Sequence, residues 1–77
     1  MTRKLRDRAL KVWEVYASTG PYGYSAPARI VFRCTSDALE RARVFAVSGD
    51  RSDAEANVVS ASVDALLEML AKARAFD

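Results

Sequence analysis

A chain of 77 residues, with 51% hydrophobic and 29% charged residues, is long enough for one folded domain and unlike a disordered chain in composition. Its single cysteine excludes an internal disulfide, and the absence of histidine removes the usual general base, the histidine-containing catalytic triads and most zinc sites. The net charge of +2 is uneven, since residues 1–33 carry +5 and residues 34–77 carry −3, which indicates either an acidic partner or pairing between the two halves within the chain or a dimer.

Residues 3–18 are predicted to form a helix. Apolar side chains recur along this stretch at the spacing of one helix face: Leu5, Ala9, Val12 and Tyr16. A second, basic face has the same spacing and consists of Lys4, Arg8 and Lys11. This basic face suits either phosphate groups or plain solvent. Gly20 and Pro21 are expected to end the helix.

Residues 19–27 are predicted to form a loop, because two glycines and two prolines fall within this short stretch. The loop carries Tyr22 and Tyr24. Tyrosine on a restrained backbone offers a large contact area with few rotatable bonds. These rings are therefore expected either to bind a partner or to cap the core.

Residues 29–34 and 41–47 are predicted to form an antiparallel hairpin, because both are rich in β-branched and aromatic residues. Period-two alternation places Arg29 and Arg33 on one face of the first strand. It likewise places Arg41 and Arg43 on one face of the second. Were these arginines to converge with the basic helix face, they would form a surface for nucleic acid. Residues 36–43 have an alternative interpretation as a short helix.

Residues 52–75 are predicted to form one long helix. Its start matches a capping box formed by Ser52 and Glu55. Apolar residues then repeat at spacings of three and four: Ala56, Val59, Val63, Leu66, Leu70 and Ala73. Because residues 57–62 have poor helix propensity, they are alternatively a third strand, with the helix beginning at Ser62. The same stripe would pair with its own copy, so we expect a homodimer.

The expected fold is therefore a single α+β domain over residues 1–77 with the order α-β-β-α. An antiparallel hairpin is covered on one face by two helices, since two strands alone are marginally stable. The predicted core is Trp13, Ile30, Phe32, Phe45, Val63, Leu66 and Leu70.

Candidate chemistry is sparse. The sequence contains neither of the glycine-rich phosphate-binding motifs, and Asp53 and Glu55 are better explained as charges at a helix start than as metal ligands. Cys34 ends an apolar strand and is expected to be a buried structural thiol. We therefore expect no enzyme activity, no metal and no cofactor. A lone cysteine, with no signal peptide and no membrane span in the sequence, suggests the cytoplasm.

In size, layout and lack of catalytic groups, the chain resembles the small single-domain proteins with which phages and mobile elements block host systems, anti-CRISPR proteins among them. No residue carries this resemblance, so no functional residue is transferred. It implies a non-enzymatic inhibitor that contacts another protein or a nucleic-acid-handling complex. The alternative is a small nucleic-acid-binding protein with a basic patch. The expected contact residues are Tyr22, Tyr24, Lys4, Arg8, Lys11, Arg29, Arg33, Arg41 and Arg43.

Overall fold

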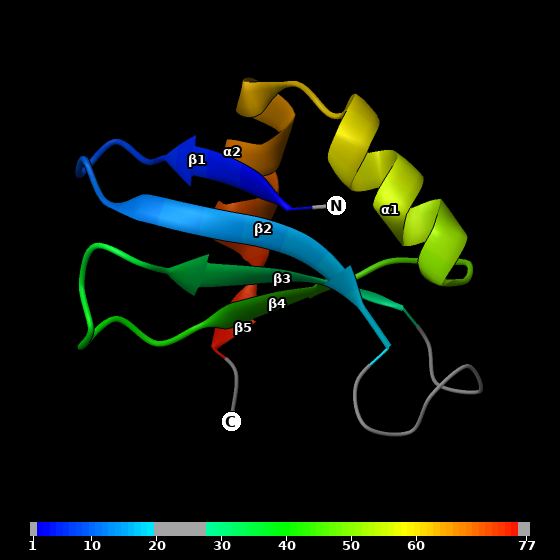
Figure 1. The fold of residues 1–77 in the computed structure, drawn as a ribbon, viewed down its shortest axis with the longest axis horizontal. Helices are drawn as coiled ribbons and strands as arrows, with labels where there is room; N and C mark the ends of the chain where they lie inside the picture. Colours follow the sequence, from blue (N-terminus) through cyan, green and yellow to red (C-terminus); the bar gives the residue numbers. More distant parts are fainter. Residues whose placement is uncertain (1, 20–27, 76–77) are drawn as a thin grey trace.

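The computed structural model describes residues 2–19 and 28–75, which form an α+β domain with an antiparallel five-stranded sheet and two helices (Figure 1). The strands lie in the sheet in the same order as in the chain, and each pairs antiparallel with the next. The elements are β1 (Arg3–Arg6), β2 (Val12–Ser18), β3 (Arg29–Cys34), β4 (Arg43–Ala46), α1 (Arg51–Ser60), α2 (Val63–Lys72) and β5 (Arg74–Ala75).

The predicted helix over residues 3–18 is wrong, and with it the α-β-β-α order. This segment forms the β1–β2 hairpin, in which Leu5 pairs with Trp13. Along β2, Trp13, Val15 and Ala17 are buried and alternate with partly exposed residues, which is the period of a strand. Because β2 is rich in β-branched and aromatic residues, this period prevails over the weaker helical spacing.

Asp7 closes the turn between β1 and β2. Its Oδ1 accepts hydrogen bonds from the backbone N–H groups of Ala9 (2.9 Å) and Lys11 (3.0 Å). Its Oδ2 accepts one from the indole N–H of Trp13 (2.9 Å). An aspartate that bonds to the backbone two residues ahead favours a turn over a helix. Asp7 therefore favours a turn at a position where the sequence predicted a continuous helix.

The predicted β3–β4 hairpin is confirmed, although the second strand spans Arg43–Ala46 rather than residues 41–47. Residues 36–42 form turns and irregular backbone, so the alternative short helix does not occur. In this connection the N–H of Leu39 donates to Asp37 (3.0 Å). Local bonds of this kind satisfy backbone groups without a helix.

The predicted long helix over residues 52–75 is divided into α1 and α2 at Ala61 and Ser62, and it ends at Lys72 because Arg74 and Ala75 form β5. Ser62 is the N-cap of α2, accepting a bond from the N–H of Ala65 (3.1 Å), as the alternative helix start predicted. The third strand of that alternative does not form, because α1 continues to Ser60. The capping box of α1 consists of Asp50 and Asp53 rather than of Ser52 and Glu55.

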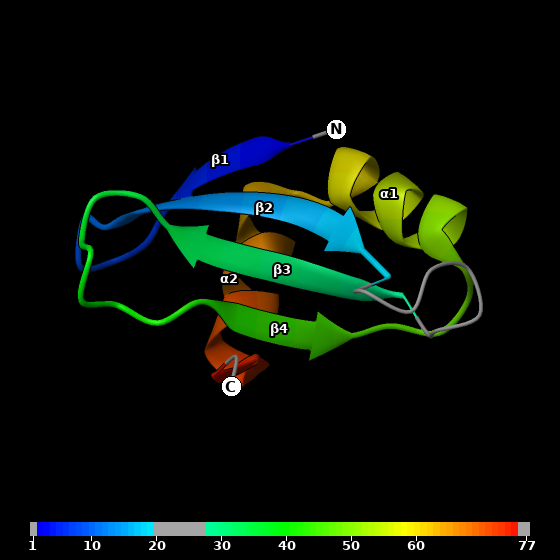
Figure 2. The ribbon, with the colours of Figure 1, turned by 60° about the horizontal axis from the view of Figure 1, so that its bottom comes forward.

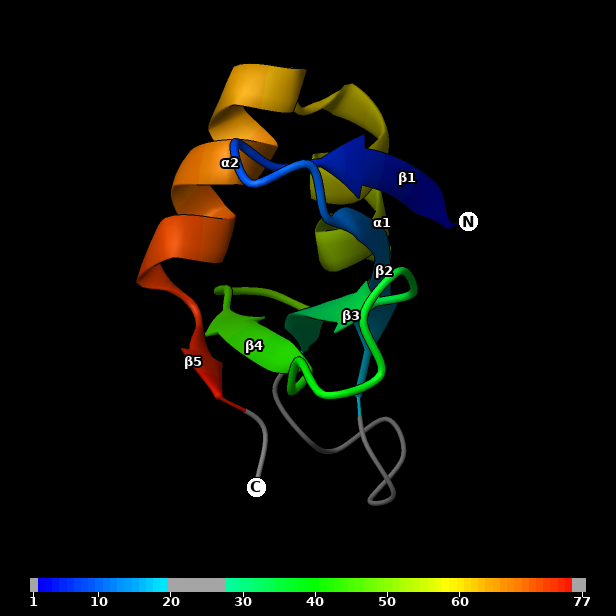
Figure 3. The ribbon, with the colours of Figure 1, turned by 90° about the vertical axis from the view of Figure 1, so that its left-hand side faces the viewer.

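Both helices lie on the same side of the curved sheet (Figure 3). Helix α1 packs against β2 and β3, whereas α2 packs against β4 and β1. Among the described residues, neither helix is long and apolar enough to span a membrane.

The core fills the space between this inner side of the sheet and the helices. Of the predicted core residues, Trp13, Ile30, Phe32, Leu66 and Leu70 are buried, and Phe45 is half-buried against them. The prediction is wrong for Val63, which is 51% exposed at the first position of α2. Cys34 is buried, as expected.

Candidate functional site: the outer face of the sheet

The helices leave the other side of the sheet without a covering element among the described residues (Figure 2). Because successive side chains of a strand point to opposite sides, the residues that alternate with the core project from this side. We call this set the outer face, and it consists of Lys4, Arg6, Val12, Glu14, Tyr16, Ser18, Arg29, Val31, Arg33, Val44, Ala46 and Arg74.

The outer face is strongly basic. Its cations are Lys4, Arg6, Arg29, Arg33 and Arg74, and all of them are exposed. Glu14 is the only acidic residue in the five strands. Within residues 2–19 and 28–75, none of these cations forms an ion pair, so their charges are available to a partner.

Strand register orders the outer face into rows. One row crosses β1, β2 and β3 through Lys4, Glu14 and Arg33. The next row crosses β2 to β5 through Tyr16, Val31, Val44 and Arg74. The following row contains Arg29. The aromatic and apolar row, in which Tyr16 and Val44 are partly exposed and Val31 is 7% exposed, is therefore flanked on both sides by rows that carry cations.

A groove of about 440 Å³ continues this surface at the edge of β4. Strand β5 pairs only with Arg43 and Val44, so the edge of β4 beyond them has no strand partner in the described sheet. The groove has an apolar floor and three cations, its lining being Arg29, Val44, Phe45, Ala46, Lys72 and Arg74. Such a lining favours an anionic group over a cationic one.

The structure brings some of the predicted contact residues together on the outer face and places others elsewhere. Arg29 and Arg33 share the outer face as expected, and Lys4 joins them from β1. Arg8 lies in the β1–β2 turn, and Arg41 lies exposed before β4. The basic helix face does not exist because its segment is not a helix. Tyr22 and Tyr24 lie outside the described residues.

The predicted pairing of Arg41 with Arg43 on one strand face is wrong, because β4 begins only at Arg43. Arg43 projects to the inner side, where it pairs with Phe32 of β3. Its guanidinium lies 5.4 Å from the ring centroid of Trp13 and donates to Glu40 (3.1 Å) and to the carbonyl of Leu70 (3.3 Å). Arg43 therefore has a structural role.

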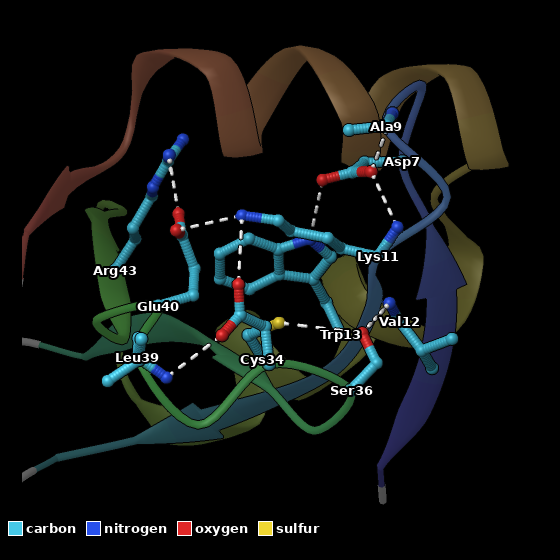
Figure 4. A network of polar contacts seen from close by, with 11 residues as sticks. Asp7, Ala9, Lys11, Val12, Trp13, Cys34, Ser36, Leu39, Glu40 and Arg43 are labelled. Carbon is cyan, nitrogen blue, oxygen red and sulfur yellow. Dashed lines mark hydrogen bonds and ion pairs between the residues drawn. The ribbon is translucent and has the colours of Figure 1, made fainter.

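Lys11 also belongs to this internal network (Figure 4). Its Nζ lies 3.1 Å from Glu40 and 3.4 Å from Asp37, and these bonds hold the pKa of Lys11 above its ordinary value. The pKa of Asp37 is held below its ordinary value by hydrogen bonds, first from the backbone N–H of Leu39 and second from the side chain of Lys11. Lys11 thus forms the predicted ion pairs between the basic and acidic halves of the chain, whereas the outer-face cations form none among the described residues.

Sequence reasoning missed Tyr16 and Arg74 as members of this surface. A period-two interpretation of residues 12–18 would have found Tyr16, because it alternates with buried Val15 and Ala17. The two residues of β5 carry no such signal, so Arg74 could not be placed without its pairing to Val44. The described part of the chain holds no group of three or more potential metal ligands.

Comparison with protein-family models, with curated proteins and with solved structures finds no match for this chain.

Proposed function

We propose that this protein binds single-stranded nucleic acid on the outer face of its sheet. The observation that carries the proposal is the combination of exposed cations with an aromatic and apolar row, on the face that no described element covers. Arginine and lysine form charge-assisted hydrogen bonds with phosphate oxygens. Tyr16 supplies a ring on which an unpaired base can stack. The proposed activity is binding, without chemistry on the bound strand.

The arrangement favours a single strand over a duplex. In a duplex the bases are paired and stacked on one another, so an apolar row on a sheet has nothing to contact. In a single strand, bases can contact the partly exposed side chains of Tyr16 and Val44 while phosphates reach the flanking cations. The groove at the edge of β4 would take a phosphate where the strand leaves the sheet.

Salt dependence tests the phosphate contacts. Binding of oligonucleotides of about twelve nucleotides, measured by fluorescence anisotropy, should weaken steadily as salt is raised. Arg33→Gln should lower the slope of log K against log salt by about 0.7, the value for one phosphate contact with a single strand. The matched control is Arg51→Gln on α1, where Arg51 lies 3.6 Å from Glu55 and away from the outer face. This control should bind like the wild type.

Substitution of the tyrosine tests the stacking. Tyr16→Leu should lower the affinity about 5- to 150-fold, the cost of losing one stacked base, whereas Tyr16→Phe should retain most of it. A folded wild-type protein that binds no oligonucleotide even in low salt would refute the proposal. Equal affinity for a duplex, unchanged by Tyr16→Leu, would refute the preference for single strands.

A protein-binding inhibitor, acting through contact with another protein, is the second candidate. The exposed cations of the outer face favour it as well, because they would complement an acidic protein surface and speed association. Capture from a lysate, repeated with Tyr22→Ala/Tyr24→Ala and with Arg29→Gln/Arg33→Gln, would show which residues hold such a partner. If both double variants still captured the partner, this candidate would be contradicted.

A further inference from the structure

Leu10 is held in a conformation that its own chemistry does not favour. Its φ is 66°, in the left-handed region that suits glycine or asparagine, yet its side chain is 73% exposed. The turn is fixed by two bonds, from Asp7 N–H to the carbonyl of Lys11 (2.9 Å) and from Leu10 N–H to the carbonyl of Asp7 (3.0 Å). Backbone strain and an exposed leucine at one position point to a contact outside the monomer.

A second exposed leucine lies on the neighbouring loop at the same end of the sheet. Leu39 is 93% exposed, in the connection between β3 and β4. The two loops are joined by the Lys11 ion pairs with Asp37 and Glu40, and by a bond from the N–H of Val12 to Ser36 Oγ (2.9 Å). This end, which we call the leucine end, is therefore pre-organised rather than loose.

A groove of about 670 Å³ lies directly beside the leucine end. Asp7, Arg8 and Ala9 form one wall, helix α2 forms the other, and Arg43 of β4 also lines the groove. The helix wall is apolar and acidic, with Leu67, Ala71, Asp64 and Glu68. Asp64 and Glu68 are one helical turn apart, where like charges repel, and neither has an ion-pair partner among the described residues.

We propose that this surface joins two copies of the chain about a two-fold axis, with Leu10 of each copy in the α2 groove of the other. A two-fold interface requires one patch that carries both a projection and its complement. Here the projection is Leu10, and the complement is the adjacent α2 groove. The charges also match, because Arg8 and Arg41 on the leucine end would meet Asp64 and Glu68 of the second copy. This assembly leaves the outer face of the sheet free, so it is independent of the proposed nucleic-acid binding.

The decisive variant is Leu10→Asn, because it separates folding from assembly. Asparagine tolerates the left-handed conformation, so the variant should fold and have an equal or higher melting temperature as a monomer. It loses the apolar contact, so dimer affinity, measured by sedimentation equilibrium, should fall at least about tenfold. The matched control is Val59→Asn on α1, where Val59 is 53% exposed and away from the leucine end. This control should leave the dimer affinity unchanged.

A mixing experiment identifies the groove. Ala71→Gln fills the groove at an exposed helix position and should also weaken the dimer. A dimer of either variant alone lacks both contacts between Leu10 and the groove. A mixed dimer restores one of them, because Leu10 of the Ala71→Gln chain enters the open groove of the Leu10→Asn chain. The mixture should therefore associate at least about tenfold more tightly than either variant alone.

Three outcomes would overturn the proposal. One is a monomer mass for the wild type at several hundred micromolar. Another is a dimer whose affinity neither Leu10→Asn nor Ala71→Gln changes, because it would use another surface. A third is a monomer whose binding to vesicles of anionic phospholipid is lost in Leu10→Asn, because the leucine end would then serve a lipid surface.

Discussion

Arg3 of β1 and Arg43 of β4 lie on one row across the inner side of the sheet, and each bonds to the last turn of a different helix. The row runs from Arg3 through Val15 and Phe32 to Arg43. Arg3 donates to the carbonyls of Val58 (2.9 Å) and Ala61 at the end of α1, and Arg43 donates to Leu70 near the end of α2. Cations at helix C-termini satisfy free carbonyls and oppose the helix dipole.

These bonds predict that the inner arginines stabilise the fold and that the outer ones do not. Arg3→Met and Arg43→Met should each lower the free energy of unfolding by about 1.5–3 kcal/mol, because each removes charge-assisted hydrogen bonds. Arg33→Met, on the outer face, should change it by no more than about 0.5 kcal/mol. Urea denaturation followed by circular dichroism measures all three. Equal losses for the inner and outer variants would contradict this division of roles.

Leu66 and Val63 lie on the same helix but differ in burial, which gives a second prediction. Leu66 is fully buried, so Leu66→Ala should lower the free energy of unfolding by about 2–5 kcal/mol through lost contacts and a cavity. Val63 is 51% exposed, so Val63→Ala should change it by no more than about 0.5 kcal/mol. Thermal melting curves of the two variants provide the measurement, and a large loss for Val63→Ala would place that residue in the core after all.

Asp7 predicts a dependence of stability on pH. Partial burial raises the pKa of Asp7, but hydrogen bonds from Trp13, Lys11 and Ala9 together hold it below its ordinary value of 3.8. At pH values between the folded and unfolded pKa, the unfolded chain therefore binds more protons, and stability rises with pH. The contribution of Asp7 should be complete above about pH 5 and lost as the pH falls through the folded pKa.

The measurement is chemical denaturation of the wild type and of Asp7→Asn between about pH 2 and pH 6. Asparagine keeps an oxygen that can accept the turn bonds but cannot titrate. The difference in unfolding free energy between the two proteins should shrink as the pH falls. A constant difference over this range would show that the carboxylate charge of Asp7 does not contribute.

Gly49 is predicted to be intolerant of a side chain. Its φ is 100°, and a Cβ built there would lie 2.9 Å from Cγ of Asp53, whose carboxylate accepts the bond from Asp50 N–H that completes the α1 cap. Gly49→Ala should therefore lower the free energy of unfolding by about 1–3 kcal/mol. Ser48→Ala is the neighbouring control and should have little effect. Relative to Asp53→Ala alone, adding Gly49→Ala leaves the backbone strain and the 2.9 Å contact with Cβ of residue 53, without the contact with the carboxylate.

The sequence by itself was sufficient for the features that depend on neighbouring residues. The alternation in residues 29–34 identified β3 and placed Arg29 and Arg33 on one face, because a strand has a period of two whatever its partners are. The serine at position 62 indicated the alternative start of a helix that α2 has, because an N-cap bonds to the helix that follows it. The α+β class followed from these local signals.

Tertiary structure decided the features that depend on pairing between distant residues. In residues 3–18 the helical and strand periods overlap, and the strand prevails because β2 gains a partner in β3 and buries Trp13 and Val15 against the helices. The register of β4 against β3 turns Arg43 inward. The outer face collects its cations from β1, β3 and β5, and local sequence carries no information on that assembly, because the free energy of sheet pairing and burial is shared between segments far apart in the chain.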